Sequence, residues 1–372
     1  MTEIKTYATH FCGVGGACRG LELAGLKCAF AIDNYDVAVE YRKKNLGHQA
    51  VLADITEYEH SDSQAADLLW TSPPCQTFSK SAYEQTKAKA KLGVTDKRDN
   101  LFLCSLEYVK KFKPKFFVLE NVVGLLSHVD ALGQATKDYI IRSFADAGYH
   151  VEWNILCSAD FGVPQLRERL FIVGALKELG LKGLIPDDGS DSQGYPLRPR
   201  PTFGMVMKKN VTSKAWKGKT YKTALKAFYR TGRYISILMP YDIMPTITCG
   251  FGGGATRKKV GVCDQTKEGV AFVRHPTIEE GALCQGFPRD WKWPRNQTEA
   301  WTLVGNAVTV DVSLSIASHL IALSNGESPK AKRTLPASRI AEFVKIYGKE
   351  EDQAPMLDGL EYNVYMGTEE GE

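Results

Sequence analysis

The chain has 372 residues, of which 44% are hydrophobic and 24% are charged, and its formal net charge is +4. This is the composition of an ordinary globular protein, long enough for about two domains of roughly 150 residues each. The nine cysteines form no C-x-x-C pair and no Cys/His cluster at zinc spacing, which argues against a disulfide framework and a metal site. The N-terminus has no signal-peptide pattern, and no run approaches the roughly 18 apolar residues of a membrane span. We therefore expect a cytoplasmic protein that does not contact membranes.

The first half of the chain alternates short apolar or β-branched runs with helical patterns. Predicted strands cover about 6–16, 27–33, 48–55, 66–74, 115–122, 150–158 and 167–176. Helical patterns at about 18–26, 37–45, 101–113 and 137–149 lie between them. Such alternation predicts an α/β fold with a doubly wound, mostly parallel seven-stranded sheet.

The pattern changes after Leu181, where Gly, Pro and Ser cluster and the alternation stops. Between Arg198 and Tyr241 there are eleven Lys or Arg and no Asp or Glu, and interleaved with them are Trp216, Tyr221, Phe228, Tyr229 and Tyr234. A basic block of this kind is either a disordered arm or a polyanion-binding face, and the aromatic residues favour the folded face. We predict a first domain over 1–180, a smaller second domain over 181–290, a helical return to the first domain over 291–325 and a charged extension over 326–372.

Candidate ligand-binding residues end several of the predicted strands, whose carboxyl ends meet at one crevice. The segment "FCGVGG", from Phe11 to Gly16, ends the first strand and opens the first helix. Its glycines let backbone N–H groups approach a ligand, although the third glycine of a dinucleotide motif is replaced by Cys18. Asp33 ends the second strand, where an acid can accept hydrogen bonds from ribose hydroxyls. The alternatives are a tight turn for the glycines and, for Asp54 after the third strand, a helix cap.

Three further features point to chemistry. Cys75 follows Pro73 and Pro74, which force the chain out of the sheet. This position favours a nucleophilic thiol, whereas the residue type alone favours a buried structural cysteine. Glu120 directly follows an apolar run, where burial favours a carboxyl able to hold a proton, although a turn cap is equally consistent. Arg167 and Arg169 alternate onto one strand face and suit a phosphate or a base edge, unless they are ordinary surface arginines.

Taken in order, these segments resemble the DNA (cytosine-5)-methyltransferases of bacteria and phages. The similar segments are "FCGVGG", "PPCQ", "ENV", "QLRER", "RHPTIEEGALCQGFP" and "GNAV", and they run from about residue 8 to about 320. The resemblance implies a Rossmann-like, class I S-adenosylmethionine-dependent methyltransferase fold with a target-recognition domain. It implies transfer of a methyl group to C5 of a flipped cytosine in duplex DNA, with S-adenosylhomocysteine as the product and no metal.

The resemblance also implies a role for each matched residue. Cys75 would attack C6 of the cytosine, Glu120 would contact N3 and the amine, Arg169 would hold the O2 side, and Arg167 would support the loop. Cofactor contacts would come from Phe11, Gly13, Gly15, Asp33, Asp54, Pro74, Asn306 and Val308. DNA contacts would come from Ser81, Arg98, Thr246, Thr248 and Arg257. The expected partner is double-stranded DNA, with a restriction endonuclease that acts on the same site without direct contact, and the expected state is a monomer.

Other functions stay open on the sequence. A tRNA cytosine-5 methyltransferase shares "PPCQ", but its Cys-Phe-Thr tripeptide is absent here. A nicotinamide-dependent oxidoreductase explains the glycines and Asp33 but not "PPCQ" with "ENV", and a catalytically silent DNA-binding member would not need Cys75 and Glu120. Two positions depart from the family pattern, Leu283 for an arginine and Leu303 for a glutamine. The recognition sequence is not readable, because base readout depends on groove contacts and DNA shape.

Overall fold

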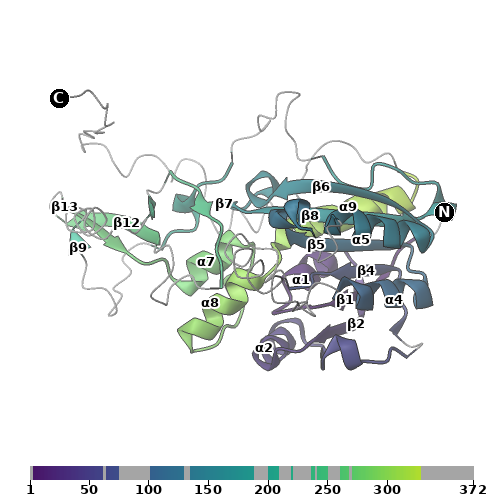
Figure 1. Cartoon of the computed structure of the whole chain (residues 1–372). Helices are drawn as coiled ribbons and strands as arrows, with labels where there is room; N and C mark the ends of the chain where they lie inside the picture. The colour runs from purple at the N-terminus through teal and green to yellow at the C-terminus, as the bar shows by residue number, and fades with distance from the viewer. Residues whose placement is uncertain are drawn as a thin grey trace.

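The computed structural model describes residues 3–61, 64–74, 101–129, 135–187, 200–208, 219–220, 236–238, 241–249, 260–267 and 270–327. Its largest element is a seven-stranded sheet in the order β3-β2-β1-β4-β5-β8-β6 (Figure 1). The strands are β1 (Thr6–His10), β2 (Lys27–Asp33), β3 (Val51–Leu52), β4 (Leu68–Thr71), β5 (Phe116–Val122), β6 (Tyr149–Cys157) and β8 (Glu168–Leu176). Only β8 is antiparallel to its neighbours in this sheet, β5 and β6. The prediction of a mostly parallel seven-stranded sheet is confirmed.

Helices cover both faces of the sheet, as the side-chain alternation along β5 requires. Phe116 and Val118 pack in one hydrophobic cluster with α1 (Gly16–Leu23) and α9 (Val310–Ser324). Phe117 and Leu119 pack on the opposite face with α4 (Phe102–Phe112) and α5 (Thr136–Asp146). Because both faces are covered, the first four residues of β5 are all apolar rather than alternating, and all four of these side chains are fully buried. The remaining helix of this half, α2 (Asp36–Leu46), follows β2.

The second half of the chain carries a smaller four-stranded sheet in the order β10-β12-β13-β9, which lies away from the large sheet (Figure 1). Its strands are β9 (Lys219–Thr220), β10 (Ser236–Leu238), β12 (Val260–Lys267) and β13 (Val270–Arg274). A short parallel pair connects the two halves, because β11 (Met244–Pro245) pairs with β7 (Gln165–Leu166). Position 165 therefore lies where the second half of the chain meets the first.

The chain returns to the large sheet through α7 (Ile278–Cys284), α8 (Gln297–Asn306) and α9. The helical return expected over 291–325 includes two helices, α8 and α9, because the backbone is extended at Ala307 between them. Residues 297–324 together have the length and composition of a membrane span, which the sequence prediction did not anticipate, but 67% of the 18-residue apolar window within them is buried inside the protein. Packing of α9 along α1 in the core accounts for this apolarity.

Gly20 on α1 is the reason these two helices approach so closely. A Cβ atom built on Gly20 would lie 2.1 Å from Ser313 Oγ and 2.5 Å from the Val310 carbonyl oxygen of α9. A Cβ on Gly16 would lie 2.2 Å from the Val308 carbonyl oxygen. Two small residues four positions apart thus let the C-terminal helix lie directly on the helix that follows the glycine-rich turn.

Candidate active site

The turn after β1 is shaped by residues in the left-handed region of backbone conformation. Phe11 has φ of 56° and Gly13 has φ of 52°. A Cβ on Gly13 would meet nothing within 4 Å among the described residues, which leave space beside this stretch of backbone. The Gly13 N–H donates to Asp33 Oδ2 at 2.7 Å, which connects the ends of β1 and β2. The glycines therefore hold the turn open for a ligand at the carboxyl edge of the sheet.

The Asp33 carboxylate lies at the end of β2 and is held by two backbone donors. Besides Gly13, the Tyr35 N–H donates to Oδ1 at 2.9 Å. Burial raises the pKa of Asp33, and the backbone hydrogen bonds oppose this shift. Each carboxylate oxygen keeps a further lone pair, so Asp33 can still accept hydrogen bonds from two hydroxyl groups.

The other predicted cofactor residues divide into exposed and buried ones. Asp54, Pro74 and Asn306 are exposed, whereas Gly15 and Val308 are buried. Asp54 caps a short 3₁₀ helix, accepting from the Thr56 backbone N–H at 2.9 Å, and this bond lowers its pKa. The helix-cap alternative is thus present, and a ligand contact through Asp54 stays a prediction.

Glu120 and Arg169 form the charged pair of the candidate site. Glu120 lies on β5, is 8% exposed, and faces β8, where Arg169 lies. Arg169 Nε is 3.3 Å from Glu120 Oε1, and Arg169 Nη1 donates to the Glu168 carbonyl at 2.7 Å. The guanidinium is thus anchored at two points and presents its remaining N–H groups to a ligand in the crevice.

The chain that leads to Cys75 is also anchored beside Glu120. Asn121 is 3% exposed, and its Nδ2 donates to the Pro73 carbonyl at 3.3 Å. The same side chain accepts from the Val122 N–H through Oδ1. Cys75 itself lies outside the described residues, which end at Pro74 on this side. The neighbouring Asn of "ENV" was not singled out from the sequence, although its position in that motif was the available signal.

Arg167 differs from Arg169, because its side chain is 3% exposed and turns inward. Its Nη1 donates to the carbonyls of Ile247 and Gly305 at 3.0 and 3.2 Å, and its Nη2 donates to that of Ala307 at 2.9 Å. The expectation that both guanidiniums face the crevice is therefore met by Arg169 and not by Arg167. The reason is that irregular backbone at the meeting of three segments leaves carbonyl groups that need a buried donor.

A network of buried polar side chains lies around Arg167 and the carbonyl groups to which it donates. Most of this network was not predicted from the sequence. Gln165 donates to the Cys284 carbonyl and accepts from the Ile247 N–H, and Gln285 donates to the Val304 carbonyl. Thr309 then connects Gln285 to Ser158 through its hydroxyl group. Buried polar side chains in segments without periodicity carry no sequence signal of their own, since only the tertiary structure supplies their partners.

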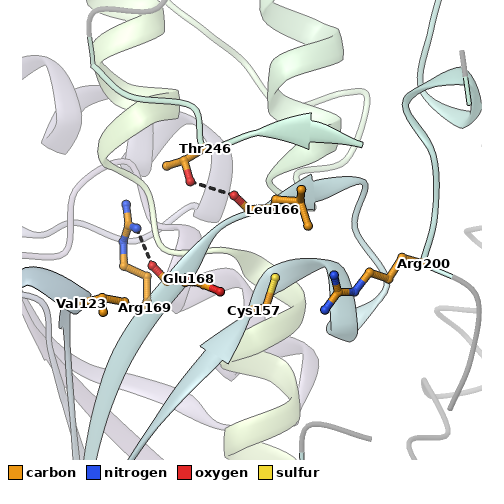
Figure 2. Close-up of a pocket in the computed structure, with 7 residues that line it drawn as sticks. All are labelled: Val123, Cys157, Leu166, Glu168, Arg169, Arg200 and Thr246. Atoms are coloured by element: carbon orange, nitrogen blue, oxygen red, sulfur yellow. Dashed lines mark hydrogen bonds between the residues drawn. The ribbon is translucent and has the colours of Figure 1, made fainter. Parts of the chain in front are cut away.

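A pocket of about 450 Å³ opens beside Arg169, between the large sheet and the second half of the chain. Figure 2 shows its lining residues Val123, Cys157, Leu166, Glu168, Arg169, Arg200 and Thr246. Arg200 reaches it from the start of the basic block and makes two hydrogen bonds to Asp160, at 2.9 and 3.2 Å. Arginine, glutamate and hydroxyl groups together make a polar site suited to a hydrogen-bonding ligand such as a nucleotide.

The predicted DNA contacts are only partly described. The Thr246 hydroxyl donates to the Leu166 carbonyl at 2.7 Å and lines the pocket, and Thr248 is exposed nearby. Ser81, Arg98 and Arg257 lie outside the described residues, as does most of the basic block. All five stay predictions, and within the described residues no group of three His, Cys, Asp or Glu could hold a metal ion.

The strand order, the single antiparallel strand and the charged pair at the carboxyl edge define a Rossmann-like fold of the methyltransferase type. Two solved structures share it at low identity: the Entamoeba histolytica methyltransferase EhMeth and the Schizosaccharomyces pombe Dnmt2 methyltransferase. The first has a TM-score of 0.65 at 16% identity, covering 86% of this chain and 98% of its own. The second has a TM-score of 0.64 at 20% identity, covering 86% and 99%.

The family follows from the sequence comparison. Residues 8–322 match the family model of the C-5 cytosine-specific DNA methylases, so the chain belongs to this family and is a DNA cytosine-5 methyltransferase. The type II methyltransferase M.FnuDI of Fusobacterium nucleatum is 31% identical over 331 residues, which are 83% of this chain and 92% of the relative. M.BsuFI of Bacillus subtilis, also a type II methyltransferase, is 28% identical over 316 residues, covering 84% and 71%. The resemblance stated from the six segments is confirmed.

Proposed function

We propose that this chain is a sequence-specific type II DNA methyltransferase that moves a methyl group from S-adenosylmethionine to C5 of a cytosine flipped out of duplex DNA. The observation that carries the proposal is the Glu120–Arg169 pair, with its 3.3 Å contact at the end of β5. It lies beside the anchored Pro73, two residues before Cys75. Relatives with the type II name support the same conclusion.

The residues at the carboxyl edge of the sheet fit the methyl donor. The Asp33 carboxylate has acceptor capacity for both ribose hydroxyls, and the described residues leave space beside the Gly13 backbone. Exposed Asp54, Pro74 and Asn306 are available as further contacts from β3, β4 and α8. When bound here, S-adenosylmethionine supplies an electrophilic methyl group on a sulfonium that leaves as a neutral thioether.

The protein side chains make the cytosine reactive. The Cys75 thiolate adds to C6, and the electron pair of the C5–C6 double bond becomes available at C5 for the methyl group. Glu120, carrying a proton, donates to N3 and accepts from the exocyclic amine, and Arg169 donates to O2, so both offset the negative charge that develops on the ring. A base then removes the proton from C5, the double bond re-forms, and the Cys75 thiolate leaves.

A cytosine within a duplex cannot be reached by this machinery, so the base must leave the stack, at a cost of a few kcal/mol. The positive charge of the basic block after Arg198 suits DNA phosphates, and the pocket lined by Arg169, Arg200 and Thr246 offers polar groups for the DNA around the flipped base. A type II role also implies a cytoplasmic, monomeric enzyme and a restriction endonuclease that acts on the same site independently.

The test is incubation with labelled S-adenosylmethionine and either duplex DNA or tRNA, using wild type, Cys75→Ala and Glu120→Gln. We expect label in duplex DNA only, no activity for Cys75→Ala and a strong loss for Glu120→Gln. Duplex DNA with 5-fluorocytosine should trap wild type covalently, since the fluorine cannot leave as a proton. Label in tRNA alone, or full activity of Cys75→Ala, would refute the proposal. Bisulfite sequencing of DNA from expressing cells then identifies the methylated sites.

A further inference from the structure

Three polar side chains are buried together beneath the strand that leads to Cys75. His10 is the last residue of β1, Thr71 is the last residue of β4, and Ser105 lies in the first turns of α4. The exposed fraction of each is 0%. The hydrophobic cluster around them contains Ala8, Leu69 and Leu106, so apolar side chains would be the default at all three positions.

The three side chains form one hydrogen-bonded chain. Ser105 Oγ is 3.0 Å from His10 Nδ1 and 2.8 Å from Thr71 Oγ1. If the imidazole carries its proton on Nε2, Nδ1 accepts from the Ser105 hydroxyl, whose oxygen accepts from Thr71. Three buried polar groups are then satisfied by one another rather than by water.

Aromatic rings fix the orientation of His10. The imidazole stacks on His60, with ring centroids 5.1 Å apart and an interplanar angle of 11°. Tyr108 and Phe30 meet it edge to face, at 5.1 and 6.1 Å. Its Nε2 lies among these rings and has no hydrogen-bond partner among the described residues. Burial holds the pKa of His10 well below its usual value, so the ring is neutral.

The position of this triad in the chain gives it its significance. Thr71 lies four residues before Cys75, and Ser105 lies on the helix that begins after the segment 75–100, outside the described residues. His10 directly precedes the glycine-rich turn. The exit from β4 is held again by the Ser72 N–H, which donates to the His10 carbonyl at 3.3 Å, and by Ser72 Oγ, which accepts from Trp70 at 3.1 Å.

We propose that His10, Thr71 and Ser105 are positioning residues, which fix the chain on both sides of the catalytic cysteine against the turn that binds the methyl donor. The proposal rests on the proposed function, in which Cys75 is the nucleophile. The triad acts through the β4 exit and not by touching DNA or cofactor. Because the thiolate must approach C6 closely and in line, a displacement of about 1 Å at the strand end lowers the rate of attack by up to about 100-fold.

The experiment measures attack by Cys75 directly, as the rate of covalent adduct formation on 5-fluorocytosine DNA at saturating DNA and cofactor. Thr71→Val removes the hydroxyl group at constant shape, and Thr71→Ser keeps it. Ser105→Ala removes the central member, and Ser143→Ala is its control, since Ser143 also lies in a helix, where its hydroxyl donates to the Tyr139 carbonyl of α5. Melting temperature and S-adenosylhomocysteine affinity are measured for every variant.

We expect Thr71→Val and Ser105→Ala to slow adduct formation by about 10-fold or more, with cofactor affinity within about twofold of wild type. Thr71→Ser and Ser143→Ala should keep nearly the wild-type rate. The double variant that combines Thr71→Val with Ser105→Ala should be little slower than either of these single variants. Wild-type adduct rates in the folded Thr71→Val and Ser105→Ala variants would overturn the inference. So would an equal loss of adduct rate and cofactor affinity, which indicates a general structural defect. If wild type forms no adduct at all, the proposed function fails instead.

Discussion

Replacement of Arg167 by methionine tests whether this residue supports the structure around the site or contacts the substrate. The guanidinium is 3% exposed and donates to three backbone carbonyls, those of Ile247, Gly305 and Ala307. Methionine fills a similar volume without a donor, so these bonds are lost in a buried place. With about 1.5 to 3 kcal/mol for each charged hydrogen bond and incomplete additivity, the expected loss of unfolding free energy is roughly 4 to 6 kcal/mol.

A loss of this size lowers the melting temperature by roughly 5 to 8 °C in a chain of this length, at about 2.1 cal/mol/K of unfolding entropy per residue. Calorimetry of wild type, Arg167→Met and Arg167→Lys checks it; lysine keeps the charge but cannot reach three carbonyls with one ammonium, so its loss should be intermediate. Arg169→Met is the companion variant. It should lose nearly all methylation activity while its melting temperature falls less, because Arg169 makes, within the described part of the chain, one ion pair with Glu120 and one hydrogen bond to the Glu168 carbonyl. If Arg167→Met melts within about 2 °C of wild type yet is inactive, Arg167 contacts the substrate, and its assignment as a supporting residue is wrong.

Three further predictions follow from single contacts. Gly20→Ala should lower the free energy of unfolding by about 1 to 3 kcal/mol in denaturant titration, because the new Cβ would lie 2.5 Å from the Val310 carbonyl oxygen. This clash outweighs the higher helix propensity of alanine, which alone would stabilise the helix by about 1 kcal/mol. In the proposed cofactor site, both carboxylate oxygens of Asp33 accept ribose hydroxyls only when the group is ionised, and burial raises its pKa. Calorimetric affinity for S-adenosylhomocysteine should therefore fall on acidification from neutral pH sooner than for an exposed carboxylate, and Asp33→Asn should bind weakly at every pH. Arg200→Lys should lower the melting temperature by a few degrees, because lysine cannot make the two parallel hydrogen bonds that Arg200 donates to Asp160. The Asp160 side chain is 5% exposed, so an unchanged melting temperature would show that solvent nevertheless screens this ion pair.

Much of the candidate site could be predicted because it consists of strand ends. The apolar runs fixed where β1, β2, β4 and β5 end, and in a parallel sheet these ends meet at one edge. Asp33 and Glu120 were found in this way, and the structure places both at that edge. The inward orientation of Arg167 could not be predicted in this way. Strand alternation does not show which backbone carbonyl groups of a neighbouring segment need a hydrogen-bond donor.

The sequence by itself determined the family and the sheet, since six ordered segments and the alternation of apolar runs are local features of the chain. Only the tertiary structure decided which polar groups share a partner. His10, Thr71 and Ser105 are far apart in the sequence and individually unremarkable, and their hydrogen bonds at 3.0 and 2.8 Å exist because β1, β4 and α4 pack together. The physical reason is that hydrophobic periodicity is encoded along the chain, whereas a buried polar group is satisfied by whatever donor or acceptor the fold brings to it.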